Sequence, residues 1–210
     1  MTKTERIINL AFQQDDIKSK IVVALERISE VFRALLWEHA KTIGLSPIQI
    51  QILIFVAYHE ESLCNVSHLA KEFNVTKPTI SDAVRVLGKK ELISKHTAEH
   101  DSRRYSIALT KEGKAIVKET ENFAEPVKQQ LQPFSEDHLS HFHTQLVQLI
   151  SSLNKSGILT EQRTCHRCRF FDKQAGQSFC QLIKKPLAAD DIRLDCPEFE
   201  AAWFLSFPYM

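Results

Sequence analysis

Residues 65–93 read NVSHLAKEFNVTKPTISDAVRVLGKKELI, a stretch that holds two short helices separated by a tight turn. Asn65 suits the N-cap of the first helix, because its side-chain oxygen can accept a hydrogen bond from a free amide of the first turn. Asn74 begins the turn, and Thr76 is the matching N-cap of the second helix. Apolar residues recur at helical spacing after both caps. Two helices joined by about three residues are typical of a helix-turn-helix.

The sequence on either side completes a larger unit. Ser46-Pro47-Ile48-Gln49 predicts a helix start, with a capping box and a proline at the first helical position. The apolar run IQIQILIFVAYH that begins at Ile48 is expected to be a buried central helix, although its alternation also suits a strand. Residues 92–110 form two alternating stretches around a charged tip, which predicts a hairpin. A helix, a helix-turn-helix and a charged hairpin together make a winged helix.

Long amphipathic helices are expected outside this unit. Apolar residues from Ile17 to Leu35 keep helical spacing over a length that suits contact with a partner chain, and Ser135 is the N-cap of a last amphipathic helix. The expected domains are N-terminal dimerisation helices over 1–43, a winged helix DNA-binding domain over 44–118, C-terminal dimerisation helices over 119–155 and a cysteine-rich metal-binding module over 156–210. The expected fold class is therefore mainly α, a winged helix-turn-helix with dimerisation helices and a small C-terminal module.

Several short motifs resemble the MarR family of bacterial transcriptional regulators, over roughly residues 20–153. The matching stretches are Leu45-Ser46-Pro47-Ile48-Gln49, Leu69-Ala70, Val75-Thr76-Lys77-Pro78-Thr79-Ile80-Ser81, Leu92-Ile93, Asp101-Ser102-Arg103-Arg104 and Leu109-Thr110-Lys111-Glu112-Gly113. The D-x-R wing tip followed by L-T-x-x-G is the most specific of them. The sequence departs from the family before Leu92, where the family commonly has glycine and this chain has Glu91.

The resemblance implies a homodimer built from the N- and C-terminal helices. It also implies that each protomer places a recognition helix in a major groove of operator DNA. A small-molecule effector is a further implied partner, since many members of the family respond to phenolic ligands, metals or oxidants. The cysteine-rich segment lies outside the common MarR pattern.

A recognition helix needs short hydrogen-bonding side chains near its N-terminus and a longer side chain further along. The residues of the second helix that meet this need are Lys77, Thr79, Ser81, Asp82 and Arg85. Helical spacing places Ser81 and Arg85 on one face, away from the apolar residues. We expect Arg85 to read guanine, and Lys77 and Thr79 to contact phosphate.

The hairpin tip supplies the other candidate DNA contacts. Arg103 is expected to enter a minor groove, where the negative potential attracts a cation. Arg104 begins the returning strand and is a second candidate. Asp101 would be repelled by DNA, so its expected role is to pair with a nearby arginine and fix the tip. The alternative is that Asp101 is simply a turn residue.

The charge distribution agrees with nucleic-acid binding, although the net charge of the chain is only +1. Residues 66–118 hold 11 Lys/Arg and 6 Asp/Glu, a local balance of +5, and the remainder holds 16 Lys/Arg and 20 Asp/Glu.

There is no G-x-G-x-x-G, no G-x-x-x-x-G-K-[ST] and no nucleophile–base arrangement, so an enzyme is not expected. No run of about 18 apolar residues predicts a membrane span, and the first residues do not resemble a secretory signal. A cytoplasmic protein is therefore expected.

Four of the five cysteines form a cluster late in the sequence. Cys165 and Cys168 form a C-x-x-C pair, Cys180 follows after 11 residues and Cys196 after a further 15. A C-x-x-C turn presents two thiolates to one metal ion, and two distant thiolates complete a tetrahedron. The segment has few apolar residues, so a metal would stabilise its fold. We expect one metal centre per chain, with structural zinc favoured over a [4Fe–4S] or [2Fe–2S] cluster; disulfides or free thiols are the remaining alternative.

Three smaller features have plainer interpretations. His138 and His141 lie three residues apart on one helix and are interpreted as surface residues rather than as a regulatory metal site. Cys64 is interpreted as a buried structural thiol rather than as a redox switch. The apolar tail over residues 203–210 is expected to pack on the dimerisation helices or on the cysteine module.

The sequence therefore predicts a sequence-specific, double-stranded DNA-binding transcriptional regulator. It is expected to act as a homodimeric repressor on pseudo-palindromic sites, with a metal or redox signal changing the spacing of its two recognition helices. The alternative is a winged-helix protein-interaction module with a structural metal site. Such a module would lack a salt-sensitive affinity for duplex DNA.

Overall fold

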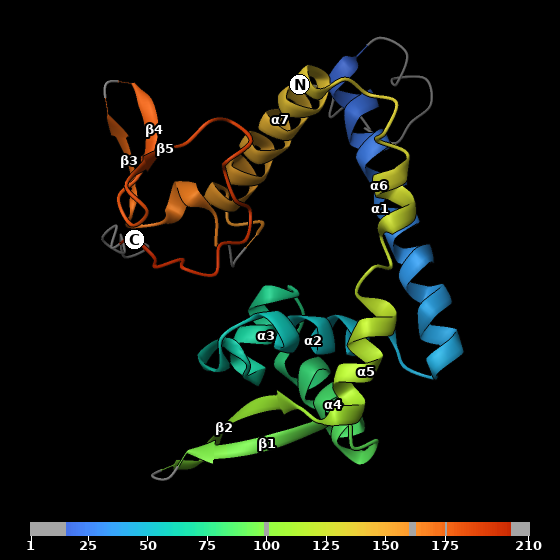
Figure 1. Cartoon of the computed structure of the whole chain (residues 1–210). Helices are drawn as coiled ribbons and strands as arrows, with labels where there is room; N and C mark the ends of the chain where they lie inside the picture. The colour runs from blue at the N-terminus through green and yellow to red at the C-terminus, as the bar shows by residue number, and fades with distance from the viewer. Residues whose placement is uncertain (1–15, 99–100, 160–162, 175, 203–210) are drawn as a thin grey trace, which may run out of the picture.

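The computed structural model describes residues 16–98, 101–159, 163–174 and 176–202, and for residues 97–98 and 101–104 it describes the backbone alone. In chain order the elements are α1 (Ile17–Ile43), α2 (Pro47–Tyr58), the short turn η1 (Glu61–Leu63), α3 (Val66–Glu72), α4 (Lys77–Lys89), β1 (Ile93–Ala98), β2 (Asp101–Leu109), α5 (Lys111–Thr120), α6 (Glu125–Gln129), α7 (Glu136–Lys155), the short turn η2 (Cys165–Arg167), β3 (Phe171–Gln174), β4 (Gln177–Cys180) and β5 (Lys185–Pro186). Figure 1 shows an open frame, in which α1 and α7 form two long sides and the unit from α2 to α5 lies at one end.

α1 is a long helix that is capped at both ends. The Asp16 carboxylate accepts hydrogen bonds from two amides of the first turn, at 3.1 and 2.9 Å, and Gly44 ends the helix with φ 64°. Leu36 and Ala40 are buried near the C-terminal end of the helix. Much of the remaining apolar face of α1 is exposed.

α2 runs through the centre of the winged helix. The Gln49 side chain accepts a hydrogen bond from the Ser46 amide at 2.9 Å, as the predicted capping box requires. Ile50, Ile52 and Leu53 are fully buried. These neighbouring residues point in different directions around the helix axis, so α2 is covered on more than one side. The prediction of a buried central helix rather than a strand is confirmed.

α3 and α4 form the predicted helix-turn-helix. The Asn65 side chain accepts a hydrogen bond from the His68 amide at 3.0 Å, and the Thr76 hydroxyl accepts one from the Thr79 amide at 3.3 Å. Asn74 lies between the helices with φ 52°, a left-handed conformation that asparagine adopts more readily than most residues. The inner faces of both helices enter the core of the winged helix. Their fully buried side chains are Leu69, Ile80, Val84 and Leu87.

β1 and β2 pair as antiparallel strands, which confirms the predicted hairpin. The register begins at the pair of Ile93 and Leu109. Ile107 is buried in the core, and its amide donates to the Cys64 carbonyl oxygen at 2.8 Å. This hydrogen bond joins the wing to the segment that precedes α3.

Two backbone positions shape the base of the wing. Glu91 has φ 58°, so the turn into β1 keeps a left-handed conformation without the glycine that is common in similar sequences. At Gly113, in the first turn of α5, an added Cβ would lie 2.0 Å from the backbone oxygen of Leu92. The Thr110 hydroxyl accepts a hydrogen bond from the Gly113 amide at 3.0 Å and donates one to the Glu91 carbonyl oxygen at 2.7 Å. α5 can therefore approach the wing this closely only because Gly113 has no side chain.

After α5 the chain returns along α1 and continues into α7. The Phe32 ring of α1 packs edge-to-face on Phe123, with ring centroids 6.4 Å apart, and α6 then follows the line of α1 in Figure 1. Ser135 caps α7 as predicted, accepting a hydrogen bond from the His138 amide at 3.4 Å. α7 ends at Lys155, close to the predicted end of this helix.

Residues 163–202 form a second, small unit, which we call the cysteine-rich segment. β3, β4 and β5 make a three-stranded antiparallel sheet in that order. Isolated bridges join Arg163 to Asp195 and Cys168 to Ala201, so the start of the segment is hydrogen-bonded to its end. The segment therefore has a defined backbone fold.

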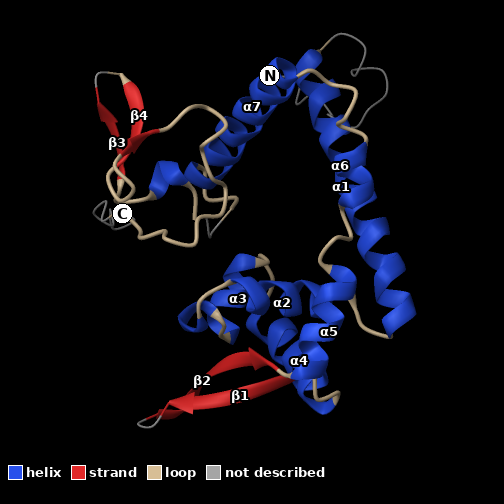
Figure 2. Ribbon diagram, viewed as in Figure 1, coloured by secondary structure: helices blue, strands red, loops and turns tan. Residues whose placement is uncertain are grey.

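The described chain is mainly helical, and its strands are confined to the wing and the cysteine-rich segment (Figure 2). The predicted winged helix with long flanking helices is thus confirmed. Within the described ranges no single helix is long and apolar enough to cross a membrane; α1 and α2 reach that length and composition only as a pair, which is bent by 93°.

Candidate nucleic-acid interface

The outer face of α4 carries the polar residues that were predicted to contact DNA. All of them are exposed: Lys77, Thr79, Ser81, Asp82 and Arg85. The opposite face of α4 is buried through Ile80, Val84 and Leu87. Because that face is held in the core, the polar face is fixed toward solvent.

Local interactions position three of these side chains. Arg85 Nη2 donates to Asp82 Oδ1 at 2.9 Å, and the two side chains are 59% and 71% exposed. The Thr79 hydroxyl lies 2.8 Å from the hydroxyl of the N-cap residue Thr76. An ion pair as exposed as that of Arg85 and Asp82 contributes about 0–1 kcal/mol to stability. Arg85 can therefore exchange Asp82 for a base or a phosphate with little loss of free energy.

The N-terminal end of α4 suits a phosphate group. Its first turn contains Lys77 and no acidic residue. The free amides and the dipole of a helix favour an anion at this end, and a lysine adds a full positive charge. The predicted role of Lys77 as a phosphate contact is compatible with this position.

The residues predicted at the wing tip are described less fully. β2 contains Asp101, Arg103 and Arg104, but their side chains lie outside the part of the chain that the structure describes. The pairing of Asp101 with an arginine and the minor-groove contacts of Arg103 and Arg104 therefore stay predictions.

Three lysines without a role in the sequence analysis extend the positive charge near α4. Lys89 and Lys90 are exposed at its C-terminal end, and Lys95 is exposed on β1. The Lys95 ammonium lies 4.5 Å from the ring centroid of Tyr105 on the neighbouring strand. The only signal for these residues in the sequence was the basic balance of the region, which does not distinguish one lysine from another.

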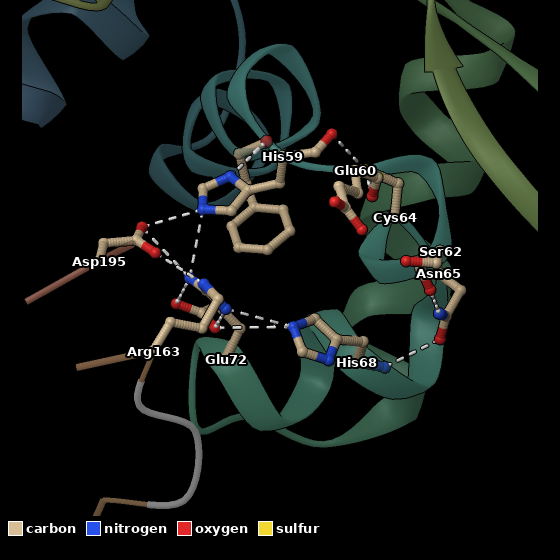
Figure 3. A network of polar contacts seen from close by, with 10 residues as sticks. His59, Glu60, Ser62, Cys64, Asn65, His68, Glu72, Arg163 and Asp195 are labelled. Carbon is tan, nitrogen blue, oxygen red and sulfur yellow. Dashed lines mark hydrogen bonds and ion pairs between the residues drawn. The ribbon is translucent and has the colours of Figure 1, made fainter. Parts of the chain in front are cut away.

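A second polar site connects the winged helix to the cysteine-rich segment, and Figure 3 shows it from close by. Arg163 donates from Nε to Asp195 Oδ1 at 2.6 Å and from Nη1 to Glu72 Oε2 at 2.8 Å. Its Nη2 also lies 3.2 Å from the second oxygen of each carboxylate. His59 and His68 surround the guanidinium, at 3.2 and 3.4 Å. We call these five residues the Arg163 cluster.

The Phe55 ring packs against two members of the Arg163 cluster. The guanidinium carbon of Arg163 lies 5.2 Å from the ring centroid of Phe55, and the His59 ring stacks on Phe55 at 3.8 Å. His59 Nδ1 lies 2.8 Å from the Phe55 carbonyl oxygen, and its Nε2 lies 2.9 Å from Asp195. A neutral His59 accepts a hydrogen bond from Arg163 through Nε2, whereas a protonated ring donates one to Asp195.

The charges of the Arg163 cluster stabilise one another. Burial disfavours the charged guanidinium, but hydrogen bonds to Glu72 and Asp195 outweigh burial and raise the pKa of Arg163. Burial likewise disfavours the Asp195 carboxylate, but hydrogen bonds from Arg163 and His59 outweigh it and lower the pKa of Asp195. A lowered carboxylate pKa stabilises the fold above the unfolded value of about 3.9, and this contribution is lost as the pH falls through the folded value.

The Arg163 cluster could not be predicted from the sequence. Arg163 lies 91 residues from Glu72 and 32 residues from Asp195, and no local motif spans such distances. One signal was available: Arg163 and Asp195 precede Cys165 and Cys196 by two residues and one residue. The segments that carry predicted metal ligands thus also carry the contact with the winged helix.

The four cysteines predicted as metal ligands surround one cavity of the cysteine-rich segment. They are Cys165, Cys168, Cys180 and Cys196. No group of three or more His, Cys, Asp or Glu side chains within the described ranges is arranged to hold a metal ion. The structure thus brings the four thiols to one place, and the metal centre stays a prediction.

Cys64, His138 and His141 have the surroundings that were expected for residues without a functional role. Cys64 is buried, and its thiol donates to the Glu60 carbonyl oxygen at 3.3 Å. Burial raises the pKa of Cys64 to about 11, which agrees with a structural thiol. His138 and His141 are exposed on α7, as expected for surface residues. The apolar tail over residues 203–210 lies outside the described residues.

An exposed polar face on the second helix of a helix-turn-helix, beside a two-stranded wing, defines a winged helix-turn-helix protein. Residues 43–104 match the family model described as MarR family. The HTH-type transcriptional repressor YetL of Bacillus subtilis (strain 168) is 36% identical over 72 residues, which make up 34% of this chain and 43% of the relative. The match thus spans less than half the length of this curated relative.

Solved structures share the fold over a longer part of the chain. The S. aureus MepR–DNA complex matches with a TM-score of 0.56 and 24% identity, over 63% of this chain and 97% of that chain. The crystal structure of the transcriptional regulator PA3341 matches with a TM-score of 0.56 and 23% identity, over 64% of this chain and 98% of that chain. The winged helix of this protein is therefore MarR-like, and the fold shared with these structures covers about two thirds of the chain.

Proposed function

We propose that this protein is a transcriptional regulator that binds double-stranded DNA as a homodimer, with α4 of each protomer in a major groove. The polar face of α4, held outward by its buried opposite face, is the observation that carries the proposal. YetL is named as a transcriptional repressor and MepR has been solved with DNA, which supports repression through operator binding. An effector would act by changing the spacing of the two recognition helices, since half-sites lie about one helical turn apart.

Each predicted DNA contact has a distinct role in this proposal. Arg85 is the base reader, because it is long enough to reach a guanine edge from the exposed face of α4. Lys77 and Thr79 contact phosphate at the N-terminal end of the helix. Arg103 and Arg104 extend the contact into the neighbouring minor groove. A metal or redox signal would act through the cysteine-rich segment, which contacts α2 and α3 at the Arg163 cluster.

The exposed apolar face of α1 supports a homodimer. Five exposed apolar side chains share this side of the helix at helical spacing: Ile17, Ile21, Ile28, Val31 and Phe32, which are 39–66% exposed. Phe142 and Leu149 of α7 are also exposed. An exposed apolar face of this kind marks an interaction site. In our proposal the same face of a second copy covers it, as the flanking helices of a two-fold dimer require.

Replacing Arg85 with alanine is expected to weaken DNA binding by about 5- to 150-fold, the loss of one base-reading contact of about 1–3 kcal/mol. The probe is a duplex selected by the wild-type protein from a random-sequence pool. Affinity is measured by fluorescence anisotropy at several salt concentrations. Lys20→Ala is the matched control, because Lys20 is an exposed cation on α1, remote in the chain from α4.

Two results would contradict this part of the proposal. If wild-type affinity for duplexes did not fall as salt rises, operator binding would be wrong, and the winged helix would be better explained as a protein-interaction surface. If Arg85→Ala and Lys20→Ala caused equal losses, the contact would not lie on the outer face of α4.

Replacing Ile28 with glutamate is expected to raise the dissociation constant of the dimer by about 100-fold or more, because the interface would bury two unpaired carboxylates. Sedimentation velocity over a range of concentrations measures the effect. Arg27→Glu is the control, since it introduces the same side chain at a neighbouring position that is 79% exposed and already polar. A wild-type chain that sediments as a monomer at all concentrations would exclude the homodimer.

A further inference from the structure

Four cysteines face one cavity of about 290 Å³ inside the cysteine-rich segment. Its apolar walls are Phe170, Phe171, Leu182, Ile183 and Leu187. The cavity is thus lined by soft ligands and apolar side chains, a combination that suits a metal–sulfur group.

Backbone hydrogen bonds hold the cysteines around the cavity. Cys165 and Cys168 lie at the two ends of the η2 turn, where the Cys168 amide donates to the Cys165 carbonyl oxygen at 3.0 Å. Cys180 ends β4 and is paired with Phe171 of β3. The Cys196 amide donates to the Arg163 carbonyl oxygen at 3.0 Å. The four thiols therefore come from three separate parts of the segment that the fold ties together.

Arg193 contributes hydrogen-bond donors to the sulfur atoms. Its backbone amide donates to Cys165 Sγ at 3.3 Å, and its Nη1 lies 3.9 Å from Cys196 Sγ. N–H groups directed at sulfur stabilise thiolate ligands and tune the centre that they hold. Of the carboxylates at the cavity, Glu198 pairs with Arg193 at 3.2 Å, and Asp191 accepts a backbone hydrogen bond at 2.8 Å. Glu198 also accepts a hydrogen bond from Cys196 Sγ at 3.3 Å, which Cys196 would give up on becoming a thiolate ligand.

The placement of the thiols around a cavity favours a larger group over a single ion. A zinc ion binds thiolates at about 2.3 Å, so its four sulfurs must lie within about 4 Å of one another. Here the four thiols line a cavity of about 290 Å³. An iron–sulfur cluster distributes its four thiolates over several irons and so bridges ligands that are farther apart. A cavity between the thiols is the space that such a cluster would fill.

We propose that Cys165, Cys168, Cys180 and Cys196 ligate an iron–sulfur cluster in this cavity. Each thiol loses its proton to solvent as it becomes a thiolate ligand, and sulfide, ferrous iron and ferric iron come from outside the chain, so that assembly needs no further oxidant. The proposal does not depend on DNA binding, because it rests on the cysteine-rich segment alone. It differs from the zinc site favoured by the spacing of the cysteines in the sequence, since that spacing fixes the number of ligands but not the distance between them.

The test uses the full-length protein, purified without oxygen and reconstituted with ferrous and ferric iron and sulfide. We expect a visible charge-transfer absorption and at least about two irons and two sulfides per chain, the content of the smaller cluster type. Metal analysis of the protein before reconstitution distinguishes a cluster from zinc. One zinc per chain that iron and sulfide do not displace would overturn the proposal, and so would a chain that retains neither metal.

Two cysteine variants test the assignment of the ligands. Cys180→Ser is expected to lose most of the bound iron, because one of the four thiolates is missing. Cys64→Ser is the control: Cys64 is buried in the winged helix and its thiol donates to the Glu60 carbonyl oxygen, as a serine hydroxyl can. Circular dichroism checks that both variants keep the helical fold. Equal iron content in the two variants would contradict the proposed ligand set, and the wild-type analysis decides the matter if Cys180→Ser does not fold.

Discussion

Replacing Gly113 with alanine is expected to destabilise the protein by about 3 kcal/mol or more, the upper range for overpacking. The new Cβ would lie 2.0 Å from the Leu92 backbone oxygen, and backbone cannot move aside as a flexible side chain can. Relief requires α5 to separate from the base of the wing, which would break the hydrogen bonds that Thr110 makes to both sides. Urea unfolding followed by circular dichroism measures the change.

Gly88→Ala is the matched control for this substitution. Gly88 lies in α4, and an added Cβ there meets nothing within 4 Å. Alanine is expected to leave stability unchanged or to raise it by about 0.5–1 kcal/mol, because glycine is the weaker helix former. A loss below about 1 kcal/mol for Gly113→Ala would show that α5 can move away from Leu92 without damage.

Arg163→Ala is expected to destabilise the contact between the cysteine-rich segment and the winged helix by about 3 kcal/mol, the lower range for removing one partner of a buried ion pair. The Arg163 side chain is 10% exposed and that of Glu72 is 20% exposed, so the glutamate would be left partly buried without its cation. We expect faster hydrogen exchange of the α3 amides, because Glu72 belongs to α3. Hydrogen exchange and urea unfolding together locate and quantify the effect.

Arg169→Ala separates this effect from the general loss of an ion pair. Arg169 pairs with Glu200 in the same segment at 2.9 Å, but their side chains are 49% and 52% exposed. An exposed pair of this kind contributes about 0–1 kcal/mol, so this variant should be close to the wild type. If the two arginine variants behaved alike, the Arg163 cluster would not hold the two units together.

The winged helix could be predicted because its signals are local. Asn65, Thr76 and Ser135 each cap a helix through an amide three residues later, so a short stretch of sequence contains both partners. The cap of α5 is local in the same way, since the Gly113 amide donates to the hydroxyl of Thr110, three residues earlier. The outward face of α4 was predictable as well, because burial of one helix face determines which residues the other face presents.

The contact between the two units was not predictable in the same way. In the sequence, Glu72 resembles any surface glutamate at the end of a short helix. Its partner Arg163 lies 91 residues away, so no local pattern indicates the pair. The cavity shows a related limit. Cysteine spacing indicated that four thiols gather, but their separation depends on how η2, β4 and the loop before Cys196 pack together. Long-range geometry of this kind is set by the whole fold and not by a motif.

The burial of Cys64 has a consequence for chemical labelling. Its thiol stays protonated at neutral pH and is closed off by the core, whereas the other four cysteines are partly accessible. A maleimide reagent should therefore modify the native metal-free chain at four positions and leave the fifth untouched. Modification of Cys64 then reports transient opening of the winged helix. The rate of this modification therefore measures how often the native chain opens.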